Sequence, residues 1–285
     1  MSSSASTIRF RRVAPADRDQ LLDIAARTWE GHDYLPQVFD TWVSDRRAFF
    51  GALVQAGRVV GCGRVYPFDE KHGWLEGLRV HPDHQGHGLG REVARRVIAQ
   101  AVSMGLRRLY FSTYFDNASS MRISEMLGFH RFTTCTNLDL RDLADDTQDA
   151  EASAAGGIES RSGMPDIAAL MSNDWFFVPA EIRDRARYFP RPLTVRGCGA
   201  EMLLADNSKF PDHLEIAWMA APDGRLPPPL IAAAVTEARR RGHRHVHVML
   251  PEDYALEPFT AFGFRYFEQP HDVPLYTARA EQLRL

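Results

Sequence analysis

Hydrophobic and polar positions follow two different periods along the first half of the chain. Apolar residues recur every three or four positions in 17–28 and 89–104, which predicts two helices. Short runs rich in β-branched, aromatic and other apolar residues, bounded by turn residues, predict strands. These strands are expected at 8–13, 48–55, 59–66, 74–80, 109–113 and 129–140, with shorter helices at 39–43 and 118–127. This order of elements indicates an α/β fold in the broad sense, in which helices pack on a mixed sheet as in α+β proteins.

The periodicity stops between residues 142 and 157, where small and acidic residues end in Gly156-Gly157. A segment of this composition has little to bury, which is typical of a linker. The sequence therefore predicts a first domain at 1–141, an acidic Ala/Ser/Gly linker at 142–157 and a second domain at 158–285.

The second half repeats landmarks of the first half in the same order, which favours two copies of one α/β fold. The matched pairs are Leu75-Glu76 with Leu214-Glu215, Pro82-Asp83 with Pro222-Asp223, Gly105 with Gly242, and Gly128-Phe129 with Gly263-Phe264.

Composition narrows the class of protein. The 285 residues are 45% hydrophobic and 25% charged, which suits two globular domains. A net charge of −3 favours neither a nucleic acid nor an anionic membrane as partner. The three cysteines, Cys62, Cys135 and Cys198, are odd in number and widely spaced, so we expect no disulfide framework and no zinc knuckle. Without an apolar leader or spanning segment in the sequence, a cytoplasmic protein is expected.

The segment from Gln85 to Gly90 carries the strongest chemical signal. It reads Gln-Gly-His-Gly-Leu-Gly and lies between a predicted strand and the longest predicted helix. The first N–H groups of a helix lack internal partners and carry the positive end of the helix dipole, and glycines let a bulky anion approach them. A dinucleotide fingerprint has a different spacing and place in the fold. A turn without a ligand and a pyrophosphate site remain as alternatives.

Two motifs together resemble the GNAT family of N-acetyltransferases over residues 7 to 140. Gln85-x-x-Gly88-x-Gly90 follows Leu78-Arg79-Val80-His81-Pro82, and Asn117 precedes a helix that ends in Leu127-Gly128-Phe129. The resemblance implies an acyltransferase that uses acetyl-CoA as cosubstrate, without a metal and without a covalent intermediate. The implied cofactor-binding residues are Leu78, Arg79, Val80, Gln85, Gly86, His87, Gly88, Leu89, Gly90, Arg91 and Asn117.

The resemblance also implies where the chemistry takes place. A bulge at Gly77 would open the strand for the pantetheine arm. Glu76 is the candidate general base, directly or through water, with an ordinary exposed carboxylate as the alternative. The family often has a tyrosine as general acid where this chain has Ser124. Tyr114 or a water molecule is the alternative acid.

The acceptor is expected near the first two helices. Residues 28–36, with Trp42, resemble a branch related to vertebrate histidine N-acetyltransferase. Candidate substrate-binding residues are Glu30, Asp33, Tyr34 and Arg79, whose charges suit a zwitterionic amino acid. The alternative is that Tyr34, Leu35, Phe39 and Trp42 are core residues. A free amino acid or small primary amine is the leading acceptor, ahead of a protein N-terminus or lysine. An oligomer is not predicted.

The second copy has lost the candidate anion site. Pro227, Pro228 and Pro229 remove three N–H donors at the corresponding turn, so we predict a degenerate domain. His243, His245 and His247 alternate on a predicted strand, and a polar strand face is favoured over a metal site. Two other functions remain open, a non-catalytic acyl-CoA sensor or interaction protein, and a transferase for a longer acyl group.

Overall fold

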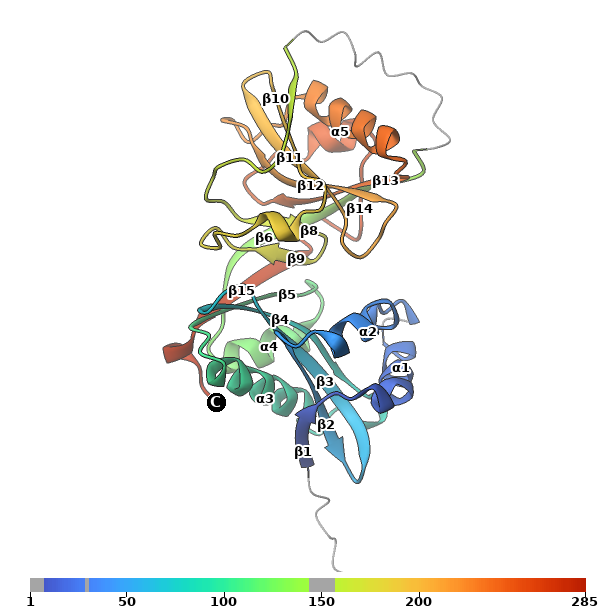
Figure 1. The fold of residues 1–285 in the computed structure, drawn as a ribbon, viewed down its shortest axis with the longest axis vertical. Helices are drawn as coiled ribbons and strands as arrows, with labels where there is room; N and C mark the ends of the chain where they lie inside the picture. Colours follow the sequence, from blue (N-terminus) through green and yellow to red (C-terminus); the bar gives the residue numbers. More distant parts are fainter. Residues whose placement is uncertain (1–7, 29–30, 144–156) are drawn as a thin grey trace, which may run out of the picture. The chain divides into compact units, whose positions relative to one another are not determined.

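The protein, seen here as a computed structural model, is described for residues 8–28, 31–143 and 157–285. The chain groups into two compact units (Figure 1). The first unit contains Met1–Phe111, Asn117–Arg131 and Tyr276–Leu285, and the second contains Ser112–Asp116 and Phe132–Leu275. In the described residues, no helix is long and apolar enough to cross a membrane.

The first unit is a sheet covered by helices on both faces. Its strands follow the order β1-β2-β3-β4-β5-β15. The strands are β1 (Ile8–Arg12), β2 (Phe49–Gln55), β3 (Arg58–Pro67), β4 (His72–Val80), β5 (Arg108–Ser112) and β15 (Val273–Arg279). The helices are α1 (Arg18–Ala26), α2 (Leu35–Ser44), α3 (Leu89–Ser103) and α4 (Ala118–Met126). The pairs β1–β2, β2–β3 and β3–β4 are antiparallel, and the pair β4–β5 is parallel.

The two faces of this sheet bury different helices (Figure 1). The apolar stripe of α3, including Val93 and Val97, packs on one face with Val60 and Val65 of β3. The other face carries α1 and α2, whose Phe39 and Trp42 pack with Phe50, Cys62 and other buried residues. The helix expected at 39–43 is longer than predicted, because Leu35 and Pro36 begin it one turn earlier.

The second unit is built from the same kind of elements. Its strand order is β6-β13-β12-β11-β10-β7, and β14 also pairs with β6. Its strands are β6 (His130–Leu140), β7 (Glu159–Ser162), β10 (Leu193–Gly197), β11 (Ala200–Asp206), β12 (His213–Ala220), β13 (His245–Pro251) and β14 (Arg265–Tyr266). A separate hairpin joins β8 (Met171–Asn173) to β9 (Phe176–Val178), and the helices are α5 (Pro228–Arg241) and α6 (Glu257–Ala261).

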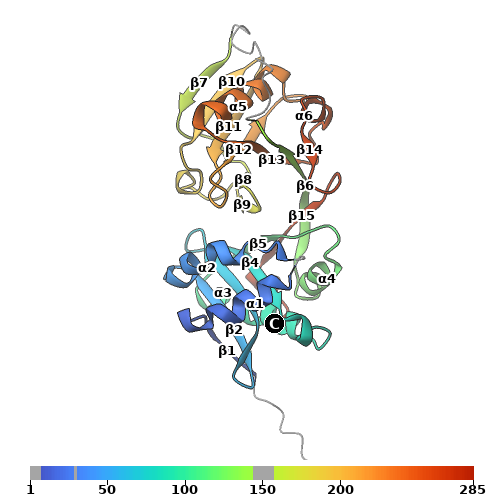
Figure 2. The same ribbon diagram turned by 90° about the vertical axis from the view of Figure 1, so that its right-hand side faces the viewer.

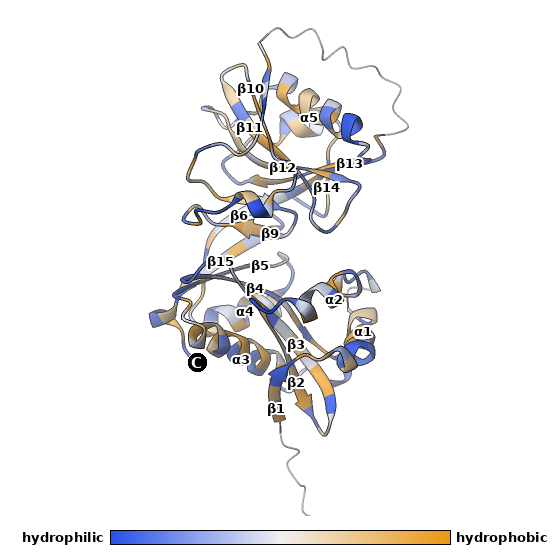
Figure 3. Cartoon of the chain, viewed as in Figure 1, coloured by the Kyte–Doolittle hydropathy of each residue, from blue (hydrophilic) through white to orange (hydrophobic). Residues whose placement is uncertain are grey.

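Helix α5 covers one face of the second sheet (Figure 2) and buries Leu230, Ile231, Ala234 and Val235 in its core. Its last turn is polar (Figure 3) because it contains Arg239–Arg241. These cations are favourable there because they lie at the negative end of the helix dipole. The predicted repeat is therefore present in the fold. The order of strand, turn, helix and parallel strand in β4, α3 and β5 recurs in β12, α5 and β13.

Each sheet is completed by a strand from the other half of the sequence. In the first unit β15 lies next to β5, with Tyr276 stacked 5.0 Å from Phe111 and the Thr277 hydroxyl donating to the Leu109 carbonyl at 3.0 Å. In the second unit β6 pairs with β13 over Cys135–Leu140. This grouping differs from a division at one linker, because the last ten residues complete the first sheet. Most of the predicted linker, 144–156, lies outside the described residues.

Candidate functional site

Strand β4 has an irregularity in its middle. Cys62 of β3 pairs with Arg79 while Arg64 pairs with Glu76, so Gly77 and Leu78 together face a single residue. Gly77 has a φ of +70°, which glycine adopts without strain, and a Cβ there would lie 2.7 Å from the Trp42 ring. The bulge predicted at Gly77 is confirmed, and it turns Glu76 away from the face that simple alternation would give it.

Beyond the bulge, β4 separates from β5. The two strands pair only over His72–Trp74 and Arg108–Tyr110 within the described chain. Leu78 and Val80, which lie past the last paired residue, pack against the α3 side of the sheet. Past Trp74 their backbone groups therefore pair with no residue of β5, so the two strands form an open V, and the Val80 carbonyl accepts from the Gln85 side chain instead. An extended ligand with amide groups can add itself to such an edge.

The turn between β4 and α3 presents a row of donors. Gln85 N–H donates to the Pro82 carbonyl at 3.1 Å, and the first helical bond runs from Glu92 N–H to Gly88 at 3.1 Å. Between them, no described group accepts a hydrogen bond from the backbone N–H groups of residues 86–91. Gly86 and Gly88 both have a φ of +78°, which turns successive N–H groups toward one side. Six amides at a helix start fit a diphosphate.

Other predicted cofactor residues shape this turn. The Gln85 side chain donates to the Val80 carbonyl at 3.1 Å, which ties the turn back to β4. Gly90 faces α4, where an added Cβ would lie 3.3 Å from Ile123. Asn117 caps α4 by accepting from Ser120 N–H at 3.1 Å. The structure thus gives Gln85, Gly90 and Asn117 structural tasks beside the ligand contacts predicted for them.

Glu76 is buried as predicted, but its neighbour is a charge rather than an apolar surface. Its carboxylate forms an ion pair with Arg64, and only 8% of the Glu76 side chain is exposed. Arg64 also donates to Asp45 at 2.8 Å and lies 4.9 Å above the Trp42 ring. Arg64 and Asp45 were missed at the sequence level, because nothing in the spacing of β3 and α2 marks them as partners of β4.

The residues predicted to hold an amino acid contact one another. Arg79 forms a buried two-point pair with Asp33, including a 2.6 Å bond from Nη2, and lies 4.8 Å over the Tyr34 ring. Burial by itself lowers the pKa of Arg79, but Tyr34 and Asp33 outweigh it, so the net pKa is raised. Leu35, Phe39 and Trp42 are buried, so the core alternative is confirmed for them. Glu30 lies outside the described residues.

The two candidate acids are in different environments. Ser124 is half-buried on α4 and its hydroxyl has no hydrogen bond to any described residue. Tyr114 belongs to the second unit, where it stacks 4.8 Å from Trp175 and 5.9 Å from Phe267. Burial, followed by nearby carboxylates such as Glu268, raises the pKa of Tyr114.

The corresponding turn in the second unit differs in two ways. Pro227 is the N-cap of α5, so the proline run predicted to remove donors does stand at the helix start. In addition, the Tyr254 hydroxyl donates to the Met219 carbonyl at 3.0 Å and accepts from Ala221 N–H at 3.2 Å. Tyr254 therefore binds backbone groups at the end of β12, whereas the contact at the corresponding end of β4 in the first unit is made by the Gln85 side chain. Sequence reasoning missed this contact.

Fold and site together define a tandem α/β protein with an intact anion turn in one unit and a blocked one in the other. The structure of a tandem GNAT protein from the clavulanic acid biosynthesis pathway has the same fold, with a TM-score of 0.57 and 16% identity. The match covers 96% of this chain and 99% of that protein. Residues 18–129 match the family model described as the acetyltransferase (GNAT) family.

Two curated relatives carry names of acetyltransferases. An amino-acid acetyltransferase of Salmonella typhi is 37% identical over 65 residues, which are 22% of this chain and 15% of that protein. A mycothiol acetyltransferase of Actinosynnema mirum is 28% identical over 135 residues, 44% of this chain and 45% of that protein. The chain thus spans less than half the length of either relative.

Proposed function

We propose that this protein is an N-acetyltransferase that moves an acetyl group from acetyl-CoA to a small primary amine. The observation that carries the proposal is the row of backbone N–H groups at residues 86–91 without acceptors in the described chain. A row of six such donors at a helix start suits an anion, and the GNAT match over 18–129 supports the diphosphate of coenzyme A as that anion.

The first unit has parts for the rest of the cofactor. The V between β4 and β5, with Leu78 and Val80 on its edge, suits the amides of a pantetheine arm. When bound there, acetyl-CoA supplies the acetyl thioester. Transfer forms the amide bond as the carbon–sulfur bond breaks. The ammonium proton passes to a base and the departing thiolate takes a proton from an acid.

Glu76 is the proposed base, directly or through a water molecule. Its ion pair with Arg64 holds the carboxylate in one orientation on the α2 side of β4. Cys62 lies beneath the bulge and donates to the Gly77 carbonyl at 3.5 Å. Burial raises the pKa of the Cys62 thiol to about 12, so this cysteine stays a neutral thiol at neutral pH. This favours a direct transfer over an acyl intermediate on Cys62. Ser124 and Tyr114 remain the candidate acids.

The names of two relatives, amino-acid acetyltransferase and mycothiol acetyltransferase, support a small-molecule acceptor. Asp33, Tyr34 and Arg79 remain proposed contacts for an amino acid, although Asp33 and Arg79 neutralise each other in this structure. A protein N-terminus or lysine is the second acceptor class.

A thiol-release assay with acetyl-CoA and a panel of free amino acids, amines and a peptide tests the activity. We expect turnover with at least one small amine, and loss of turnover in Glu76→Gln with coenzyme A affinity retained. Tight coenzyme A binding without thiol release for any amine would instead identify an acyl-CoA sensor. Release only with longer acyl-CoA would identify a different acyl donor.

A pair of glycine variants tests the anion turn. Gly88 and Gly57 have φ values of +78° and +79°, and an added Cβ meets nothing within 4 Å at either position. Alanine at either site costs about 1–2 kcal/mol of stability for the left-handed conformation. Gly57 lies in the β2–β3 turn, so Gly57→Ala is a matched control. We expect calorimetry to show weaker coenzyme A binding in Gly88→Ala only. Equal affinity in both variants would remove the basis of the proposal.

A further inference from the structure

Three neighbouring strands of the second unit place two rows of polar side chains on one face. His213 is in register with His245, and Glu215 with His247, across the parallel pair of β12 and β13. On the other side of β13, His247 is in register with Asp139 of β6. Because side chains alternate along a strand, these in-register residues share a face of the sheet. Ionisable groups so close together need partners when they are buried.

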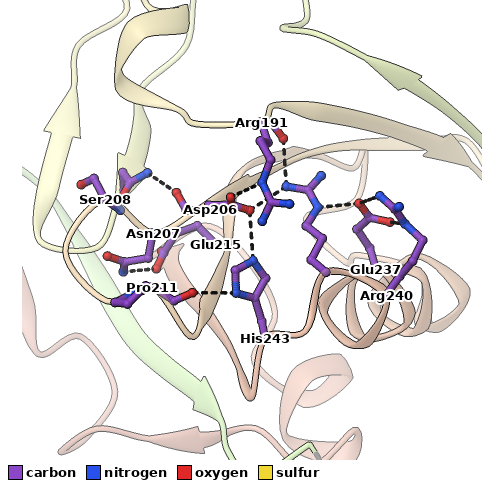
Figure 4. A network of polar contacts seen from close by, with 11 residues as sticks. Arg191, Asp206, Asn207, Ser208, Pro211, Glu215, Glu237, Arg240 and His243 are labelled. Atoms are coloured by element: carbon purple, nitrogen blue, oxygen red, sulfur yellow. Dashed lines mark hydrogen bonds and ion pairs between the residues drawn. The ribbon is translucent and has the colours of Figure 1, made fainter.

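The first row is closed by its own hydrogen bonds. The His247 ring contacts Glu215 at 2.7 Å through Nδ1 and Asn137 at 2.8 Å through Nε2. Asn207 donates to the second Glu215 oxygen at 2.6 Å. His243, the third histidine of this stretch, is also occupied elsewhere, by Asp206 at 3.0 Å and the Pro211 carbonyl at 3.0 Å (Figure 4). These groups have no capacity left for another ligand.

The second row is open at its centre. One ligand atom each from Asp139, His213 and His245 lies within 4.8 Å of the other two. Two of these residues have a buried atom without a hydrogen-bond partner among the described residues, Oδ1 of Asp139 and Nδ1 of His245. The Asp139 side chain is only 10% exposed. An unsatisfied buried polar atom costs about 1–3 kcal/mol, so two in one cluster indicate a missing partner.

The surrounding hydrogen bonds determine which atoms face that partner. Asp212 binds Nδ1 of His213 at 2.8 Å, which leaves Nε2 of His213 as the ligand atom. Nε2 of His245 lies 3.5 Å from Asp212, which leaves its Nδ1. Arg141 holds Oδ2 of Asp139 at 2.6 Å, which leaves Oδ1. Carboxylates that hold the far nitrogen of a histidine and donors that orient a ligating carboxylate are typical of metal sites.

We propose that Asp139, His213 and His245 form a binding site for a divalent transition-metal ion of the zinc type. Two imidazoles and one carboxylate are ligands that zinc prefers, and a water molecule completes four-fold coordination. Zinc–ligand bonds of about 2.0–2.1 Å place ligand atoms about 3.3 Å apart, so the stacked rings of His213 and His245, whose centroids are 4.4 Å apart, must rotate to close the cluster onto an ion. His213 and His245 are 21% and 16% exposed, so an ion can enter from solvent.

The electrostatic surroundings agree with a bound cation. Three carboxylates, Asp139, Asp212 and Asp142, act on the His245 ring. A bound ion would join β6, β12 and β13, and β6 is the strand contributed by the first half of the sequence. We therefore expect the ion to stabilise the second unit.

Calorimetry with zinc chloride on the chelator-treated full chain tests the site. The parent for all variants is Cys198→Ser, which removes an exposed thiol that would also bind zinc. We expect His213→Ala and His245→Ala each to bind one equivalent less than the parent. Asp212→Asn should retain the equivalent with affinity lowered about 10-fold to 100-fold, because a hydrogen-bond partner of a ligand is lost. Zinc should raise the melting temperature of the parent and leave that of His213→Ala unchanged.

His130→Ala is the matched control, because His130 is exposed at the start of β6 and outside the cluster. It should bind zinc as the parent does. Adventitious binding, for example at the histidines of the turn before α3, would persist equally in every variant. Equal stoichiometry and equal melting shifts in the parent and His213→Ala, or equal zinc affinity in the parent and Asp212→Asn, would overturn the proposal. Asp212→Asn changes a half-exposed residue, so this comparison does not depend on a variant that fails to fold.

Discussion

At the scale of single residues, the sequence identifies which charges matter but not which of them pair. Asp33 and Arg79 stand 46 positions apart, and their residue types suit an amino-acid ligand as well as a salt bridge. The structure joins them in a buried pair with Asp33 also accepting from Leu35 N–H at 2.7 Å. The same holds for Glu76, because its partner Arg64 is recognisable only once the register of β3 and β4 is known.

The Asp33–Arg79 pair can be tested for a structural role. Removing one partner of a buried ion pair leaves an uncompensated charge, so Asp33→Ala should lower the free energy of unfolding by about 3–5 kcal/mol. The double variant Asp33→Leu with Arg79→Met should recover most of this loss. Urea unfolding measures both. The control is Asp40→Ala, which breaks a pair with Arg18 whose side chains are 82% and 43% exposed, and about 0–1 kcal/mol is expected.

A different outcome would favour the substrate-binding role. If Asp33→Ala leaves the unfolding free energy within about 1 kcal/mol of the parent while the KM for the amine rises, the pair opens to hold substrate.

At the scale of elements, the two units show how one framework keeps or loses a site. Both carry a bulge in the strand before the turn, at Gly77 of β4 and at Ala217 of β12, where the register shifts by one residue. The glycine turn and the proline run were both recognisable from the sequence because each acts locally on backbone N–H groups. The Tyr254 contact was not, because it requires the loop after β13 to reach the end of β12.

This comparison predicts one coenzyme A per chain. The second unit lacks donors at Pro227–Pro229, and Tyr254 occupies the end of β12, whereas residues 86–91 are open. Calorimetric titration of the full chain should give a stoichiometry of one. Tyr254→Ala should leave that number unchanged, because the prolines remain. Two equivalents for the parent would show that the second unit binds as well.

At the scale of the whole molecule, the sequence predicts two copies of a fold but not how their strands are shared. Local pattern predicts a strand at 129–140 but not the sheet to which it belongs, and the strand Val273–Arg279 was not predicted from the sequence. The choice is made by neighbours distant in sequence, such as Phe111 for Tyr276 and the β13 backbone for β6. The sequence predicts a linker at 142–157, whereas each compact unit contains segments from both sides of that range.

Strand exchange has a consequence for fragments of the chain. Residues 1–141 lack β15, so Phe111 and Phe129 lose the cover of Tyr276 and Ala278, and the edge of β5 loses its partner. The Ala280 N–H, which donates to the Arg107 carbonyl at 2.8 Å, is lost as well. We expect this fragment to melt without a cooperative transition and to bind no coenzyme A. Circular dichroism and calorimetry measure the two properties.

A rescue separates loss of β15 from damage by truncation itself. Residues 1–131 joined by a flexible linker to 273–285 restore every strand of the first sheet while omitting most of the second unit. This chain should regain a cooperative melt and coenzyme A binding, since the turn at 86–91 and the V between β4 and β5 belong to the first unit alone. If residues 1–141 fold and bind without β15, the first domain is self-sufficient and the linker is the true boundary between folding units.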